Sequence, residues 1–297
     1  MFVELASIVA PVYLVAALGF GWARLGRPFD TRFVTDIVMN VGGPCLVFSS
    51  LVGLEMERDT LVAMAGATLA ALAGFALVGA ALLRAARLPL HTFLGPITFA
   101  NTGNLGLPIC FFAFGDEGLA YAVCIFAVVS LVHFTAGQWV WSGRVDAAGL
   151  LRTPLAWACL AAVLVLWTGV GVPRWLARST DLVAGLTIPL MQISLGVSLA
   201  RLRVADLRRS FALSVLRLGM GTAVGVALAW AFGFEGTARG VLILDCAMPA
   251  AVFNYMMAER YARDAEQVAS IVVVSTLLAF ALLPLLVAWL VAGGRLC

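Results

Sequence analysis

The segment Asn101-Thr-Gly-Asn-Leu-Gly-Leu-Pro108 interrupts one apolar stretch, and Asp245-Cys-Ala-Met-Pro249 interrupts another at a related place in the second half of the chain. Glycine and proline weaken helices, so both stretches are predicted to be broken near their middles. In hydrocarbon, unwound backbone persists only where it is buried in protein or lines a wet cavity. Paired broken helices of this kind are typical of membrane transporters.

The composition is that of a membrane protein. Of the 297 residues, 63% are hydrophobic and 12% are charged, and the mean hydropathy is +1.03. A membrane-spanning helix needs about 20 apolar residues, so the chain has room for about ten spans. The apolar stretches lie near residues 5–24, 33–54, 60–83, 92–115, 118–142, 153–171, 180–200, 210–232, 238–258 and 267–291. We therefore predict an all-α polytopic membrane protein with ten transmembrane helices, of which the fourth and ninth are broken.

Arginine residues are concentrated at one end of these spans. The loops after odd-numbered spans carry most of them, including Arg24, Arg84, Arg203 and Arg260. Because basic loops stay in the cytoplasm, both termini are predicted to lie on the opposite side of the membrane. The net charge of +3 arises from these loop arginines and does not indicate nucleic-acid binding.

The two halves of the chain resemble each other at an offset of 145 residues, where Thr35-Asp-Ile-Val38 corresponds to Thr180-Asp-Leu-Val183. The halves, residues 1–145 and residues 146–297, are each predicted to hold five spans. Because five is odd, the second half is predicted to be inverted in the membrane relative to the first, as in many secondary transporters. The alternative is a chance resemblance between apolar sequences.

Two asparagines lie in the break of the predicted fourth span. The side-chain amides of Asn101 and Asn104 can cap a half-helix or offer donors and acceptors to a solute. Gly103 and Gly106 permit unusual backbone conformations and Pro108 lacks an N–H, so these three residues are predicted to unwind the helix. The alternative is a kinked helix whose asparagines only satisfy freed backbone groups.

The predicted ninth span carries a second polar cluster. Met248 and Pro249 mark its break, and Asn254 and Tyr255 follow on the next turns. Asp245 is an ionisable residue inside this span, which is costly in a membrane. It is therefore expected to be paired, protonated or functional.

Two residues of other spans complete the set of candidates. Arg217 in the eighth span is the nearest candidate partner for Asp245, and it is equally consistent with neutralising a bound anion. Gln192 in the seventh span either contacts a solute or makes an interhelical hydrogen bond.

The residue types argue against pumps and enzymes. All 19 basic residues are arginine, so the chain has no Walker A lysine to hold nucleotide phosphates. It also lacks a Ser–His–Asp set, an HExxH motif and a pair of carboxylates in one span. His133 has no second His or carboxylate at metal-binding spacing, so no metal and no cofactor is predicted. We expect a gradient-driven carrier, because paired broken helices favour a carrier over a channel.

Four motifs match those of a known family. They are Asn40-Val-Gly-Gly-Pro-Cys-Leu-Val-Phe-Ser-Ser50, the segment from Asn101 to Pro108, Ile188-Pro-Leu-Met-Gln-Ile-Ser-Leu-Gly-Val-Ser198, and Met248-Pro-Ala-Ala-Val-Phe-Asn-Tyr-Met-Met-Ala-Glu-Arg-Tyr261, followed by Ser275-Thr276. On these motifs the chain resembles, nearly end to end, the auxin efflux carrier family within the bile acid–sodium symporter superfamily.

This resemblance implies a structure with two inverted repeats in which spans four and nine cross. It also implies a scaffold of spans one, two, six and seven, a mobile core of the remaining spans, and a homodimer formed through the scaffold. The location implied is a bacterial cytoplasmic (inner) membrane, in which the orientation predicted from the arginines places both termini on the periplasmic side.

The resemblance further implies transport of a small organic anion such as malonate, malate or the auxin indole-3-acetate. The anion is expected between Asn101, Gly103, Asn104 and the segment from Pro249 to Asn254, and the core is expected to slide against the scaffold. The sodium-binding cluster of bile acid symporters is not clearly present, so coupling to sodium, coupling to protons and uniport stay open. The alternatives are a cation-coupled symporter or exchanger and a sensory protein that has lost transport.

Overall fold

The computed structural model describes residues 2–52, 58–142 and 152–293, and within them the chain forms helices and no strand. In chain order the helices are α1 (Phe2–Arg24), α2 (Thr31–Ile37), η1 (Val38–Gly42), α3 (Gly43–Val52), α4 (Arg58–Ala85), α5 (Leu90–Thr98), η2 (Thr102–Gly106), α6 (Leu107–Val132), η3 (His133–Gly137), α7 (Gln138–Ser142), α9 (Pro154–Thr168), α10 (Arg174–Arg201), α11 (Leu207–Ala231), α12 (Gly236–Cys246), α13 (Val252–Arg260) and α14 (Ala265–Gly293). The three η segments are π-helical. The predicted boundary between the halves, at residues 145 and 146, lies outside the described residues.

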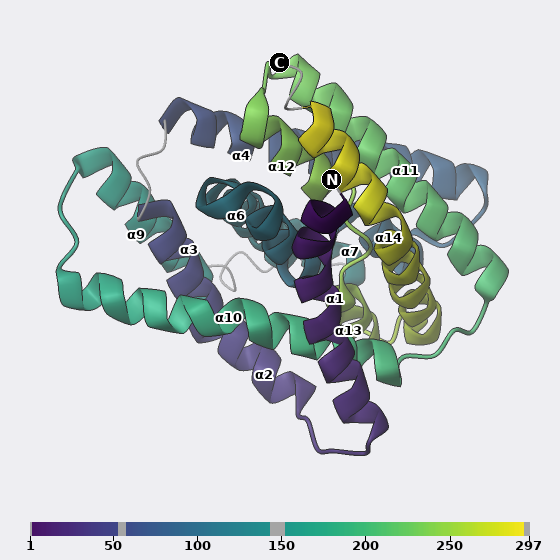
Figure 1. The fold of residues 1–297 in the computed structure, drawn as a ribbon. Helices are drawn as coiled ribbons and strands as arrows, with labels where there is room; N and C mark the ends of the chain where they lie inside the picture. Colours follow the sequence, from purple (N-terminus) through teal and green to yellow (C-terminus); the bar gives the residue numbers. More distant parts are fainter. Residues whose placement is uncertain (1, 53–57, 143–151, 294–297) are drawn as a thin grey trace.

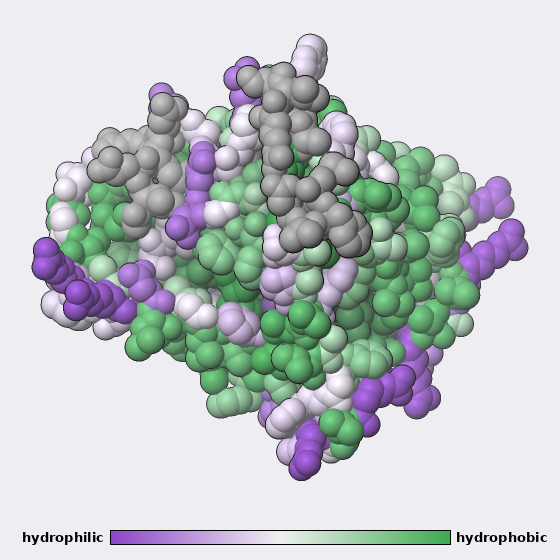
Figure 2. All heavy atoms as spheres, viewed as in Figure 1, coloured by the Kyte–Doolittle hydropathy of each residue, from purple (hydrophilic) through white to green (hydrophobic). Residues whose placement is uncertain are grey.

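Seven helical runs among the described residues are long and apolar enough to cross a membrane. They are Leu5–Arg24, Thr31–Val52, Asp59–Ala85, Thr102–Ser142, Arg174–Arg201, Leu207–Ala231 and Ala265–Val291. Apolar side chains cover most of the face seen in Figure 2, and hydrophilic side chains gather at its edges. Large apolar residues such as Leu182, Trp230 and Leu285 are exposed, as they are in proteins that face lipid. The chain is a polytopic helical membrane protein.

The longest of these runs, Thr102–Ser142, is bent rather than straight. Gly115 has φ 68° and ψ −155°, so α6 is interrupted next to the turn predicted at Asp116-Glu117. Glycine is the residue that adopts such a conformation most readily. The interruption separates residues 102–114, which continue the first broken stretch, from residues 116–142.

The helices form two groups (Figure 1). In the first group, α1 packs along α10, and α3 packs against α9 and α10. In the second group, α4 packs against α5 and α6, while α11 packs against α12 and α14. Figure 1 shows α6 between α3, α9 and α10 on one side and α11 and α14 on the other. Helix α6 contacts both groups, so the two groups meet around it.

Glycines bring the backbones of α1 and α10 close together. A Cβ added at Gly196 on α10 would overlap the carbonyl oxygen of Ala16 on α1. A Cβ at Gly19 on α1 would likewise overlap the carbonyl oxygen of Ile193 on α10. Small residues at helix contacts are a common means of packing in membranes, where no hydrophobic effect drives helices together.

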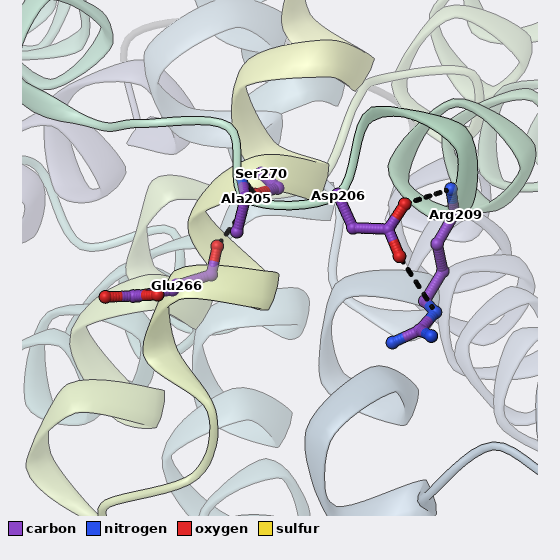
Figure 3. A network of polar contacts seen from close by, with 5 residues as sticks. All are labelled: Ala205, Asp206, Arg209, Glu266 and Ser270. Atoms are coloured by element: carbon purple, nitrogen blue, oxygen red, sulfur yellow. Dashed lines mark hydrogen bonds and ion pairs between the residues drawn. The ribbon is translucent and has the colours of Figure 1, made fainter.

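A polar network fixes the start of α11 to the start of α14 (Figure 3). The N–H of Ala205 donates to the hydroxyl of Ser270 at 2.6 Å, and that hydroxyl donates to the carbonyl of Glu266 at 2.8 Å. Asp206 caps α11 by accepting the N–H of Arg209 at 3.0 Å, and its carboxylate also pairs with that guanidinium at 3.6 Å. These contacts orient α11, which carries Arg217 toward the interior.

Replacing Gly196 with alanine is expected to destabilise the protein, because the new methyl group would force the backbones of α1 and α10 apart. Overpacking of this kind costs roughly 1–3 kcal/mol. Gly185→Ala on the same helix is the matched control, since a Cβ there meets no atom within 4 Å. The thermal unfolding midpoint in detergent should fall in Gly196→Ala only. Equal midpoints in the two variants would contradict the close packing of these helices.

Candidate functional site

The two broken stretches cross inside the protein and pair through their backbones. Ala100 and Ala250 form an isolated antiparallel bridge. Two hydrogen bonds flank it, from the N–H of Asn101 to the carbonyl of Pro249 at 2.7 Å and from the N–H of Ala251 to the carbonyl of Phe99 at 3.1 Å. In an apolar interior this pairing satisfies donors and acceptors that the interrupted helices release.

The first break lies just before the predicted one. Residues 99–101 are unwound, whereas Gly103 and Gly106 lie in η2 and Pro108 lies in the first turn of α6. Pro108 follows directly on the π-helical turn, as the second residue of α6, and the backbone remains helical through it. The prediction that these three residues unwind the helix is therefore wrong.

Gly103 and Gly106 instead allow neighbouring helices to approach η2. A Cβ at Gly106 would overlap a carboxylate oxygen of Asp245 on α12. A Cβ at Gly103 would lie 2.6 Å from the terminal methyl of Met191 on α10 and 3.0 Å from the ring of Phe126. Both glycines are thus needed for packing around the crossing.

The second break spans residues 247–251 and contains Met248 and Pro249. The N–H of Ala250 donates to the hydroxyl of Ser275 on α14 at 3.2 Å. A side chain of another helix therefore supports the unwound backbone, as buried polar groups require.

A cavity of about 80 Å³ lies at the crossing, with walls from α2, η1, η2, α6, η3, α10 and α13. Two helices begin in its wall, at the N-cap residues Asn101 and Ala251. The first turn of a helix carries free N–H groups and a partial positive charge. Two such turns at one cavity make it chemically suited to an anion.

Asn101 and Asn104 line this cavity. The side-chain oxygen of Asn101 accepts the N–H of Asn104 at 3.2 Å, and its main-chain oxygen accepts the N–H of Gly106 at 3.1 Å. Its side-chain nitrogen is buried and has no partner among the described residues. Asn101 therefore caps the helix and leaves its side-chain NH2 group unused in the cavity wall.

His133 also lines the cavity, and sequence reasoning missed it. Its ring stacks on Phe99 with 4.0 Å between centroids and meets the edge of Phe253 at 5.0 Å. Its Nε2 is buried without a partner in the part of the chain that the structure describes. The signal that could have found it is its spacing of three residues from Ser130, which also lines the cavity, since residues three apart share a helix face.

The cavity continues into a vestibule of about 1020 Å³. The two spaces share wall residues, among them Thr35, Met39, His133 and Phe253. The charged residues that line the vestibule are Asp30, Arg32, Asp36, Arg201, Glu259 and Arg260. These three arginines and three carboxylates balance, so the vestibule has no strong preference for either sign of charge.

All three π-helical segments meet at the cavity. Val38 and Met39 of η1, the first three residues of η2, and His133 and Phe134 of η3 belong to its wall. π-helical turns are rare and occur frequently at functional sites. Their convergence from three separate parts of the chain makes this cavity the candidate functional site.

Asn254 lies beside the cavity and joins the two broken stretches by hydrogen bonds. Its side-chain nitrogen donates to the carbonyl of Phe99 at 3.0 Å and to the carbonyl of Ala251 at 3.1 Å. It is fully buried and is absent from the cavity wall. The structure therefore gives Asn254 a role in holding the two broken stretches together.

Gln192 and Tyr255 also lie outside the cavity wall. The side-chain nitrogen of Gln192 on α10 donates to the carbonyl of Asn104 at 2.8 Å, so it supports η2 from the other helix group. Tyr255 lines the vestibule, where its hydroxyl lies 3.4 Å from the carboxylate of Glu259. Of the predicted contacts, Asn101, Gly103 and Asn104 border the cavity, and so do residues 251–253 of the predicted segment from Pro249 to Asn254.

Asp245 and Arg217 are buried next to the crossing and outside the cavity, with exposures of 1% and 0%. A guanidinium nitrogen of Arg217 donates to the carbonyl of Cys246 at 3.1 Å, and the group lies 4.5 Å from the ring centroid of Phe75. Neither carboxylate oxygen of Asp245 has a hydrogen-bond partner among the described residues. The direct ion pair considered from the sequence is not formed.

Replacing Asn254 with leucine is expected to lower stability, because the carbonyls of Phe99 and Ala251 each lose a donor. An unpaired buried polar group costs about 1–3 kcal/mol. Asn40→Leu is the matched control, since Asn40 is exposed and donates only to the carbonyl of Asp36 in its own helical stretch. Thermal unfolding in detergent should show a lower midpoint for Asn254→Leu than for Asn40→Leu. Equal stability would contradict the fastening role.

Comparisons with known proteins agree with these features. The family model described as membrane transport protein matches residues 5–144 and 139–287. An uncharacterized transporter of Methanothermobacter thermautotrophicus is 27% identical over an alignment of 313 positions, which covers 96% of this chain and 98% of that protein. An uncharacterized transporter of Methanocaldococcus jannaschii is 26% identical over 190 residues, which cover 59% of this chain and 60% of that protein. The chain is a transporter rather than an enzyme, and it belongs to the membrane transport protein family.

Proposed function

We propose that this protein is a carrier of a small organic anion, such as malonate, malate or an auxin-like acid. The observation that carries the proposal is the pair of helix N-termini at one cavity, with the unused amide donor of Asn101 in its wall. Partial positive charges and free N–H groups stabilise a carboxylate without a fixed cation. The cavity wall contains no charged side chain among the described residues, so no carboxylate there repels an anion.

The size of the cavity supports a small solute. Its volume is about 80 Å³. Since one water molecule needs roughly 10–15 Å³ by the same measure, several waters or the carboxylate end of an organic acid fit within it. The rest of a larger acid such as indole-3-acetate would extend past His133 into the vestibule.

We infer ten spans in two inverted repeats. The spans are α1, then α2 with η1 and α3, then α4, then α5 with residues 102–114, then residues 116–142, then α9, α10 and α11, then α12 with α13, and finally α14. Each of the two broken spans consists of helices on either side of the crossing. Five spans then lie before the segment 143–151 and five after it, which reverses the orientation of the second half.

We propose that transport follows an elevator mechanism, in which a core of spans three to five and eight to ten slides against a scaffold of spans one, two, six and seven. The hydrogen bonds between these groups include one from Gln192 to the carbonyl of Asn104 at 2.8 Å and one from Tyr13 to the carbonyl of Phe280 at 2.6 Å. Single hydrogen bonds can break and re-form during sliding, because each contributes only about 0.6 kcal/mol in membrane proteins.

The distribution of arginine supports an orientation in a bacterial inner membrane with both termini on the periplasmic side. The vestibule is lined by Arg32, Arg201 and Arg260, which lie at the arginine-rich end of the spans. In this orientation the described conformation is open to the cytoplasm. The exposed apolar face of the scaffold, which includes Trp157 and Leu182, is where we propose that a second copy binds to form a homodimer.

Purified protein in liposomes is expected to take up labelled malonate or malate with saturation, and an excess of unlabelled carboxylate should compete. Organic cations of similar size should neither enter nor compete, because the cavity presents donors and positive helix ends. Uptake is to be measured with an imposed pH gradient, with a sodium gradient and with neither. Absence of saturable uptake of malonate, malate and indole-3-acetate would reject the proposal.

Replacing Asn104 with alanine is expected to reduce carboxylate uptake by about ten-fold or more, since it removes a polar side chain from the cavity wall. Folding should be unaffected, because the hydrogen bonds of Asn104 to its neighbours use its main-chain N–H and carbonyl. Uptake in liposomes and the unfolding midpoint test the two expectations separately. Full uptake by this variant would remove Asn104 from the site.

A further inference from the structure

Asp245 is a buried carboxyl group that the anion cavity leaves unused. It lies in the last turn of α12 and is 1% exposed. Neither of its oxygens has a hydrogen-bond partner among the described residues. A carboxylate buried without donors is costly, so such a group either binds a proton or is balanced by a positive charge nearby.

A chamber of about 20 Å³ borders Asp245 and Thr98. One water molecule needs roughly 10–15 Å³, so the chamber has room for one. The hydroxyl oxygen of Thr98 is buried without a partner in the described parts of the chain, so it can bond to such a water. Ala100, Thr102 and Val129 belong to the walls of both the chamber and the anion cavity, so the two spaces adjoin.

Arg217 supplies a fixed positive charge beside this chamber. Its guanidinium donates to the carbonyl of Cys246 and lies over the ring of Phe75, and both of these residues belong to the chamber wall. Two further guanidinium nitrogens, Nε and Nη1, have no partner among the described residues. A Cβ at Gly221, one turn beyond Arg217, would overlap the carbonyl oxygen of Cys246, so this glycine lets α11 approach closely.

Few other titratable groups face Asp245. Cys110 on α6 and the adjacent Cys246 do so, and η2 contributes none. The charged residues of α4, which are Arg58, Asp59 and Arg84, lie in its first and last turns, and Glu266 lies in the first turn of α14. The charged residues of α6, Asp116 and Glu117, lie at its exposed kink. Asp245 and Arg217 are the buried members of the Asp, Glu, Lys and Arg residues that the structure describes.

The charges of these two residues determine which forms of the core can cross the membrane. In the following, the charge of the core means the sum of its buried charges and that of a bound anion. The empty core is then neutral when Asp245 is ionised, because Arg217 balances it. A bound monovalent anion makes the core negative unless Asp245 takes up a proton, which restores neutrality. An empty core with protonated Asp245 is positive. Moving an uncompensated charge through an apolar interior is costly, so the two neutral forms are the ones expected to move.

We propose that Asp245 carries a proton together with the anion, and that Arg217 is the fixed counter-charge that makes this coupling obligatory. This inference rests on the proposed function, since it assigns the coupling ion and its site to the same carrier. A proton from water on the side where the anion binds attaches to a carboxylate oxygen of Asp245. It returns to water on the other side once the anion has left. The anion crosses with a single negative charge, as half-protonated malonate does.

Asp245→Asn in liposomes tests this inference, because asparagine stays neutral throughout the cycle. The loaded core of the variant is neutral and should still move, whereas its empty core keeps the charge of Arg217 and should not return. Exchange of external labelled malonate for internal malonate should therefore stay within about three-fold of the unmodified protein, while net uptake driven by a pH gradient should fall by about ten-fold or more. Asp116→Asn, at an exposed position, is the matched control and should change neither rate.

The double variant Arg217→Gln with Asp245→Asn separates charge balance from local damage. Its empty core is neutral and its loaded core is negative, so net malonate uptake should return and should respond to an imposed voltage, positive inside, instead of a pH gradient. A dye for internal pH gives a measurement on the unmodified protein that does not depend on any variant folding. Malonate uptake should acidify the lumen.

Three results would overturn the inference. They are net uptake driven by the pH gradient in Asp245→Asn, loss of exchange in a folded Asp245→Asn protein that still binds malonate, and malonate uptake by the unmodified protein without acidification. Failure of the proposed function itself has a different signature. In that case the unmodified protein shows neither exchange nor net uptake of malonate, malate or indole-3-acetate.

Discussion

The backbone bonds between residues 99–101 and residues 249–251 are the interaction on which the rest of the structure depends. Two helices that stop inside an apolar protein release donors and acceptors that have no water to bind. The bridge between Ala100 and Ala250 satisfies those at the centre, and the side chains of Asn254 and Ser275 satisfy others at its edges. Because both helices break at this point, four helix ends are held together there.

Helix ends with a partial positive charge lie at one space, and helix ends with a partial negative charge lie at another. The two N-terminal ends, capped by Asn101 and Ala251, border the cavity. The helices that end there, α5 at Thr98 and α12 at Cys246, have their last residues in the wall of the chamber, and Arg217 donates to the carbonyl of Cys246. A cation is stabilised at a helix C-terminus as an anion is at an N-terminus. One crossing therefore places helix N-termini at one space and helix C-termini at the adjoining one.

The class of the fold and the presence of two breaks could be predicted from the sequence, because hydropathy and helix-breaking residues act locally. The same local signals identified Asn101 and Asn104, which border the cavity. The ring contacts of His133 could not be predicted, since they come from residues far away in the chain. The hydrogen bond from Arg217 to the carbonyl of Cys246 could not be predicted either, because every residue has a backbone carbonyl and the sequence does not show which one an arginine reaches.

Gly106 was correctly predicted to matter at the crossing, but the predicted reason, an unwound backbone, is wrong. Its sequence context indicated an unwound helix, yet its backbone is helical, with φ −62° and ψ −55°. Its missing side chain is what matters, because a Cβ would overlap the carboxylate of Asp245. Its N–H also donates to the carbonyl of Asn101, whose side chain caps the helix at the cavity. A displacement of η2 therefore changes the surroundings of Asp245 directly, and only a glycine permits a contact this close.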